Sequence, residues 1–341
     1  MQVLPGKRLS YALGIFVSLS LFSFVLLIFG YDPIPSLETL IMGPFGSVFN
    51  ASETFVLMAP LLLSSLAFLV AFKGRFYNIG VEGQLYIGAL SAYIASSVLG
   101  GFPSLIAVPI VAVAASIGGT LWLALPLFMR IKLQVNEVFA TLIMNFIAID
   151  IINWLTTGPI KDVNSVNPQT PFVPSTTWLA IVVPGTRFNL GVIIAILAAF
   201  VMYLIIHKTV LGYEIRASGL NPRAAQSGGV DNSRSILAVG LMSGSLAGLA
   251  GMVVINGANH LLAQNFSPGY GYQGIAVAAL GDFHPVGALF ASILYSALAV
   301  GGESMQRLPN GIPIELTYVL QVTIVLAVLL VQKWLSDRRR R

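Results

Sequence analysis

Long apolar runs separated by short polar stretches make up most of the chain. A helix needs about 20 apolar residues to cross a bilayer, and ten membrane elements can be read from the sequence on this basis. They are predicted at 11–30, 55–72, 77–99, 103–129, 135–157, 189–207, 235–256, 270–282, 284–302 and 314–332. The run at 270–282 is too short to span untilted, which predicts a broken or re-entrant path.

The composition agrees with this pattern. Of the 341 residues, 56% are hydrophobic and only 9% are charged, whereas soluble domains carry roughly 25% charged residues. We therefore expect an all-α integral membrane protein with one transmembrane domain over residues 1–341, its halves covering about 1–188 and 189–341. The chain contains no cysteine, which excludes disulfides and thiol-bound metals.

The most polar stretch, 207–234, interrupts two apolar runs and is called the polar segment below. A first short helix is predicted at 213–217, closed by Gly219. Asn221 can cap a second short helix, with Pro222 at its first position, where a missing N–H costs nothing. Two small helices between membrane spans are typical of a docking surface for another protein, and an ordinary basic loop is the alternative.

Basic residues in a membrane protein report topology, because short cytoplasmic loops are enriched in Lys and Arg. With the N-terminus inside, all eighteen Lys and Arg residues except Lys161, Arg187 and Arg307 fall on the cytoplasmic side. Both termini are therefore predicted to be cytoplasmic. The two long outer connections, 31–54 and 158–188, have a length typical of functional loops, either partner-binding segments or lids.

Two of the predicted elements begin with similar sequences. YNIGVEGQLYIGAL opens element 77–99 and YGYQGIAVAALG opens element 270–282, so that Glu82 occupies the slot of Gln273. The two elements lie five apart and run in opposite directions in the predicted topology. That parity is typical of a five-plus-five inverted repeat.

Glu82 is the first candidate for chemistry, since an ionised carboxylate inside a membrane element is costly and usually has a function or a partner. The alternative is that it pairs with Lys73 or Arg75, or caps a helix start. Asn78 precedes it by four residues, which would place both on one helical face.

The fifth element places Glu137, Thr141 and Asn145 at i, i+4 and i+8, a polar stripe on an otherwise apolar helix. Such a stripe is expected on a helix that lines a pathway or bonds to a neighbouring helix. For Asn145, contact with a solute and a structural hydrogen bond both remain open.

The sequence shows no motif for catalysis or for binding ATP. It lacks the G-x-x-x-x-G-K-[ST] loop that binds ATP, and His260 and His284 have no second histidine at metal-ligand spacing. Because the centres of the spans hold few ionisable groups, ion-driven transport is disfavoured. A passive channel and a carrier energised by a partner remain.

Four motifs then resemble a known family. YNIGVEGQLYIGA, LQVNEVFATLIMNFIA, LGYEIRASGLNPRAAQSGGV and GIAVAALGDFHPVGALFASIL are similar to the permease subunits of ATP-binding-cassette (ABC) importers for nucleosides, ribose-type sugars and branched-chain amino acids. The resemblance runs from about Phe55 to Leu330. The V-N-E-V-x-x-T-L-x-x-N pattern that starts at Val135 looks most like the nucleoside branch.

The resemblance implies a type II-like importer permease in the cytoplasmic (inner) membrane of a prokaryote, with no cofactor on this chain. Implied partners are a second permease subunit, identical or a sister chain, two cytoplasmic ATPase subunits that bind ATP and Mg²⁺, and an extracytoplasmic substrate-binding protein, with membrane lipid around them and no nucleic acid. Within a coupling segment at 208–234, the implied ATPase-coupling positions are Arg216, Gly219, Asn221, Pro222, Arg223, Ala224 and Ala225. The expected substrate pathway comprises Asn78, Glu82, Asn136, Glu137, Thr141, Asn145 and Gln273.

The expected function is passage of nucleosides across the membrane, energised by ATP hydrolysis in partner subunits. The same kind of permease for a ribose- or galactose-type sugar is the first alternative. An autonomous channel or secondary carrier is the second.

Overall fold

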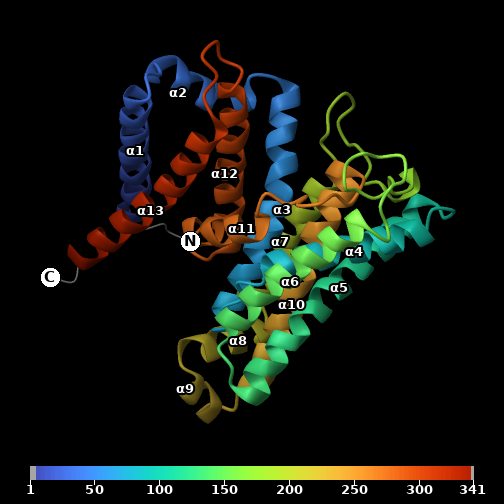
Figure 1. Cartoon of the computed structure of the whole chain (residues 1–341). Helices are drawn as coiled ribbons and strands as arrows, with labels where there is room; N and C mark the ends of the chain where they lie inside the picture. Colours follow the sequence, from blue (N-terminus) through green and yellow to red (C-terminus); the bar gives the residue numbers. More distant parts are fainter. Residues whose placement is uncertain (1–4, 339–341) are drawn as a thin grey trace. The chain divides into compact units, whose positions relative to one another are not determined.

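The computed structural model describes residues 5–338, which fold into thirteen α-helices with short 3₁₀ and π-helical stretches. The helices are α1 (Pro5–Ile28), α2 (Pro33–Met42), α3 (Val48–Lys73), α4 (Val81–Val98), α5 (Ser104–Leu133), α6 (Glu137–Thr157), α7 (Leu190–Lys208), α8 (Val210–Leu220), α9 (Pro222–Ser227), α10 (Asn232–Met252), α11 (Tyr270–Leu280), α12 (Pro285–Met305) and α13 (Ile314–Arg338). Figure 1 shows their course.

All ten predicted membrane elements coincide with helices. Seven of the described helices are long and apolar enough to cross a membrane: Val48–Lys73, Ser104–Leu133, Glu137–Thr157, Leu190–Lys208, Asn232–Asn259, Pro285–Met305 and Ile314–Val331. The expected short element is α11, whose 11 residues extend only about 16 Å at 1.5 Å per residue. This is about half the hydrocarbon thickness.

The polar segment forms the two expected short helices, but the first is longer than predicted. It runs over Val210–Leu220, because the hydroxyl of Thr209 accepts a hydrogen bond from the N–H of Gly212 and starts it earlier. The prediction that Gly219 closes this helix is wrong. The second helix, α9, begins as predicted at Pro222 after its Asn221 cap.

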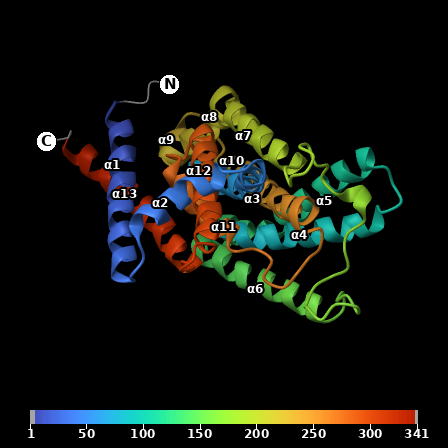
Figure 2. The ribbon, with the colours of Figure 1, turned by 90° about the horizontal axis from the view of Figure 1, so that it is seen from above.

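The chain divides into two compact units, and the division falls within α3 and α12. One unit contains residues up to Phe55 and from Ile293 onward. In it α1 lies beside α13, as Figures 1 and 2 show. The approach is close, since a Cβ on Gly14 would lie 2.7 Å from Val328 Cα.

The other unit, Val56–Ser292, is organised around α4, α5 and α10. Glycines let these three helices approach to backbone contact, as is common between membrane helices. A Cβ on Gly119 would lie 2.8 Å from Gly248 Cα, and one on Gly88 would collide with the same backbone. α10 continues into a π-helix, Val253–Asn259.

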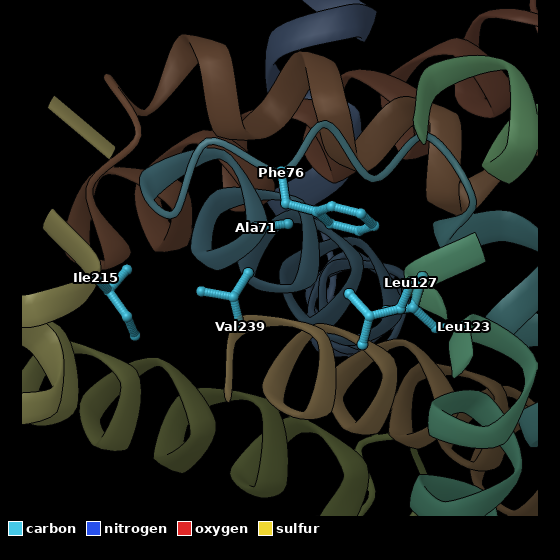
Figure 3. Close-up of a cluster of buried hydrophobic side chains, with 6 residues drawn as sticks. All are labelled: Ala71, Phe76, Leu123, Leu127, Ile215 and Val239. Atoms are coloured by element: carbon cyan, nitrogen blue, oxygen red, sulfur yellow. The ribbon is translucent and has the colours of Figure 1, made fainter. Parts of the chain in front are cut away.

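An apolar cluster closes one end of this second unit. Figure 3 shows its six buried side chains, which come from the end of α3 and the turn after it, from α5, α8 and α10: Ala71, Phe76, Leu123, Leu127, Ile215 and Val239. The cluster fixes the polar segment against the membrane helices. We call this the basic end of the unit, because Lys73, Arg75 and Arg130 lie at the same helix ends.

Candidate functional site

Glu82 and α11 meet in the interior of the second unit. Glu82 lies in the first turn of α4 and is 1% exposed. Its Oε2 accepts a hydrogen bond of 2.5 Å from the N–H of Gly271, in the first turn of α11, and the Ser267 hydroxyl also bonds to it. The positive end of a helix dipole and free N–H groups favour a carboxylate there. Glu82 therefore caps a helix start, but the helix is α11 rather than its own.

Asn145 completes the junction from α6. Its Oδ1 accepts from the N–H of Gly83 at 2.8 Å, while its Nδ2 donates to Ile79 O at 2.9 Å and to the Tyr272 hydroxyl at 3.1 Å. The side chain is fully buried. One amide thus joins α6, the start of α4 and the first turn of α11, and we call Glu82, Asn145, Gly271 and Tyr272 the polar centre.

Asn78 lies beside this centre in a closed set of hydrogen bonds. Its Nδ2 donates to Ser243 Oγ on α10 at 2.8 Å and to Gln84 Oε1 at 3.0 Å, and its Oδ1 accepts from Gln84 Nε2 at 2.9 Å. Ser243 in turn donates to Ala67 O on α3. The expectation that Asn78 shares a helical face with Glu82 is wrong, because Asn78 precedes α4. It instead fixes the entry of α4 against α3 and α10.

The predicted stripe on α6 is buried, but its members have different surroundings. Glu137 Oε2 lies 3.2 Å from Arg130 Nε at the basic end. Thr141 donates to the carbonyl of Glu137 within its own helix. Asn136 is exposed and caps α6 by accepting from Val138 N. Asn136, Glu137 and Thr141 therefore lie at the start of α6, whereas Asn145 lies at least one turn further along the helix.

One aromatic pair lies near the polar centre. Tyr86, 2% exposed, packs against Phe266 with ring centroids 4.5 Å apart. Gln273 is half-buried and donates to Pro268 O at the start of α11. The amide of Asn145, the hydroxyl of Tyr272 and the ring of Tyr86 thus lie near Glu82, whereas the side chain of Gln273 bonds at the exposed start of α11.

The predicted coupling residues lie at the basic end, in contact with the membrane helices. A Cβ on Gly219 would collide with the carbonyl oxygen of Lys73, so α8 packs backbone to backbone on the end of α3. Asn221 Oδ1 accepts from the N–H groups of Arg223 and Ala224 at 3.1 and 3.2 Å. Pro222 O accepts from Asn232 Nδ2 at 2.9 Å, which ties α9 to the start of α10.

The side of the polar segment that faces away from the membrane helices is exposed. Arg223 and Ala224 face solvent, whereas Ala225 is buried. Val210, Tyr213 and Leu220 are 74%, 61% and 85% exposed. Large apolar side chains gathered in a polar segment are typical of a protein contact.

The sequence reasoning missed several partners. Gln84 and Tyr272 lie within the two similar starts but were not singled out there, and Ser243 lies in no motif, since its bond to Asn78 joins residues distant in the chain. Asn256, fully buried in the π-helix, donates to Ser96 Oγ and Thr177 O. In the sequence, the only sign that Asn256 has a structural role was that this polar residue interrupts an apolar run.

Histidine and carboxylate positions offer no metal centre in the part of the chain that the structure describes, where no three such side chains gather. His260 instead stacks on Trp178, with centroids 3.9 Å apart. His284 lies near His207, with centroids 4.9 Å apart.

Seven described helices that are long and apolar enough to cross a membrane define a multi-pass membrane protein. A family model described as branched-chain amino acid transport system / permease component matches residues 50–329. The chain belongs to this family and is the permease component of an ABC importer, not its catalytic subunit.

Curated relatives cover nearly the whole chain. It is 33% identical to the nucleoside ABC transporter permease protein NupB of Lactococcus lactis over 88% of this chain and 85% of the relative. It is 32% identical to the guanosine ABC transporter permease protein NupP of Bacillus subtilis over 94% of each chain. The glucose ABC transporter permease protein TsgB13 of Haloferax volcanii is 30% identical over 92% of this chain and 85% of its own length. No solved structure matches the chain.

Proposed function

We propose that this permease passes nucleosides across the cytoplasmic membrane of a prokaryote. The observation that carries the proposal is the similarity, over most of both chains, to two relatives named for nucleoside and guanosine transport. Other relatives are named for glucose and galactofuranose. A sugar is therefore the second candidate.

The chemistry of the polar centre supports a neutral solute. Glu82 is held by Gly271 and Ser267, and Glu137 by Arg130, so neither carboxylate stands free to hold a cation. Asn145 and Tyr272 offer a donor and a hydroxyl to a hydrogen-bonding solute. Rings such as Tyr86 and Phe266 suit a flat base, because nucleobases stack on aromatic side chains at about 1–3 kcal/mol each.

The route proposed for the solute runs past the start of α11. Asn145 and Tyr272 now bond to each other, so a solute would enter by exchanging that bond for its own. Glu82 and Gln273 would contact the solute from α4 and α11. Asn78, Asn136, Glu137 and Thr141 would act mainly by holding the helices that form the route.

The polar segment is the proposed coupling site for the cytoplasmic ATPases. Its exposed apolar residues would rest on the ATPase, and the backbone contact between Gly219 and Lys73 would pass the movement to α3. Arg216, Asn221, Pro222, Arg223, Ala224 and Ala225 complete this contact. The basic end would then be cytoplasmic, together with both termini.

The remaining parts of the proposal concern assembly. Two permease subunits would enclose the route, an extracytoplasmic binding protein would deliver the solute, and ATP and Mg²⁺ would bind only to the ATPases. Similar starts of α4 and α11, which meet at Glu82 and Gly271, support a five-plus-five inverted repeat within the single domain.

Uptake by the complex reconstituted with its ATPases and binding protein tests the function. We expect saturable, ATP-dependent uptake of labelled nucleosides that excess ribose or galactose leaves unchanged. Uptake of the sugars instead would exclude the nucleoside proposal and retain the coupling site. Gradient-driven uptake by the permease alone would indicate an autonomous carrier and overturn both.

A further inference from the structure

A cavity of about 390 Å³ opens at the basic end of the second unit. Its walls come from five places in the chain: the turn after α3, the end of α5, the end of α8, the start of α9 and the start of α10. The residues that the argument uses are Arg75, Arg130, Ser218, Arg223, Asn232 and Ile236. The volume lies in the range of small-ligand sites.

Three arginines from three different elements line this cavity. Arg130 is partly neutralised by Glu137, whose Oε2 lies 3.2 Å from its Nε. Among the side chains that the structure describes, Arg75 and Arg223 have no carboxylate partner. The positive charges of the arginines around this cavity repel one another. An anion bound between them would attract all three.

The cavity is held in shape by its surroundings. Ile236 packs on the apolar cluster of Figure 3, whose members Phe76 and Leu127 lie next to Arg75 and one turn before Arg130. Asn232 Nδ2 fixes the start of α9 through Pro222 O. The arginines are therefore attached to a fixed frame, which lowers the cost of ordering a ligand.

One polar atom at the cavity is unsatisfied. Asn232 Oδ1 is buried and accepts no hydrogen bond in the described part of the chain. A buried acceptor without a partner destabilises the folded chain, and an anion that also carries a hydroxyl group would satisfy it.

We propose that this cavity binds a phosphate group whose organic part carries a hydroxyl, and that the phosphate bridges Arg223 of the polar segment to Arg75 and Arg130 of the membrane helices. Guanidinium groups bind phosphate oxygens in pairs of parallel hydrogen bonds, and several oxygens let one phosphate serve three arginines. The group can come from an anionic lipid such as phosphatidylglycerol, since basic pockets between membrane helices on the cytoplasmic side bind such head groups. It can equally come from a soluble phosphate ester.

This site is separate from the polar centre and does not depend on which solute is carried. A phosphate here would hold the polar segment against the helix ends. It would thereby set how firmly a movement of α9 is passed to α3, α5 and α10.

The test uses the purified full-length chain. Native mass spectrometry counts bound lipid when phosphatidylglycerol and phosphatidylcholine are offered in equal amounts. In parallel, the melting midpoint is titrated with glycerol 3-phosphate and with inorganic phosphate, against chloride at the same ionic strength. Arg75→Asn with Arg223→Gln forms the variant, because Asn tolerates the positive φ of 59° at Arg75. Arg234→Gln is the control, since Arg234 is exposed at the same end but pairs with Asp231 outside the cavity.

We expect each lost arginine to weaken binding about tenfold, the value of one charge-assisted hydrogen bond, and the control to bind as the parent chain does. Preference for phosphatidylglycerol identifies a lipid source, and midpoint shifts with glycerol 3-phosphate alone identify a soluble one; both support the site. Three results would overturn it: no phosphate-specific effect on the parent chain, equal losses in Arg234→Gln, or undiminished phosphate binding by a folded chain that carries both Arg75→Asn and Arg223→Gln. The parent titration decides the question even if the variant fails to fold.

Discussion

Glu82 Oε2 accepts a hydrogen bond from the N–H of Gly271, so a carboxylate on α4 caps the first turn of α11 through a residue 189 positions later in the chain. The contact leaves no room for a side chain on α11 at this point. The first N–H groups of a helix have no hydrogen-bond partner within that helix, and hydrocarbon offers none. A short helix that begins inside a membrane therefore needs an acceptor such as Glu82. α11 therefore depends on α4 for its position.

Replacing Gly271 with alanine should displace the start of α11. A Cβ there would lie 2.6 Å from Glu82 Cα and 2.8 Å from Glu82 Oε2, and overpacking of this kind costs about 1–3 kcal/mol. We expect a lower melting midpoint and a loss of ATP-dependent uptake. Gly101→Ala is the control, since nothing lies within 4 Å of a Cβ at that position. Equal midpoints for the two variants would contradict a tight α4–α11 contact.

Asn145 and Asn136 allow the same substitution to be compared at two places on α6. Asn145→Asp keeps the acceptor for Gly83 N–H but removes the donors to Ile79 O and Tyr272, and it adds a buried charge. Unsatisfied buried groups cost about 1–3 kcal/mol each. Asn136→Asp keeps a good helix cap, because Asp and Asn are nearly equivalent there. Thermal unfolding of both variants should show a clear loss only at position 145, and unchanged stability of Asn145→Asp would mean that this amide does not hold the junction.

The features that could be predicted from the sequence are those that depend on residues close together in the chain. Apolar runs are local, so all ten predicted elements coincide with helices, seven of which are long and apolar enough to cross a membrane. The cap of α9 is local too, since Asn221 bonds to residues two and three positions ahead. The stripe on α6 was predicted because helical periodicity brings Glu137, Thr141 and Asn145 to one face.

Partners distant in the chain could not be predicted. Asn78 bonds to Ser243 across 165 residues and Glu82 to Gly271 across 189, and no spacing rule connects such pairs. Gly219 was misread for a related reason. A glycine near a helix end often closes the helix, but here the missing side chain serves a close approach to Lys73.

That approach gives a prediction for coupling. Gly219→Ala would place a methyl group against the carbonyl oxygen of Lys73 and push α8 away from α3. We expect the assembled complex to hydrolyse ATP while its solute uptake falls at least severalfold. Gly228→Ala in the same segment is the comparison, because the atom closest to its Cβ would be Ala225 O at 3.3 Å, a far milder contact that lies within the polar segment and does not involve α3. Parallel measurement of hydrolysis and uptake separates uncoupling from misassembly, and full uptake by Gly219→Ala would show that this contact does not carry the movement.

His260 gives a prediction for pH dependence. It follows the span that ends at Asn259, and burial, followed by the positive charge of Arg187, lowers the pKa of its imidazole below the usual 6.5. The unfolded chain then takes up a proton more readily than the folded chain, so this contribution to stability is present above pH 6.5 and is lost as the pH falls through the folded pKa. His260→Asn should reduce that loss, and Asn suits the backbone φ of 59° at this position. Melting midpoints of both proteins, measured stepwise from pH 7.5 downward, should converge with acidification. Parallel curves would show that His260 does not titrate between the folded and unfolded states.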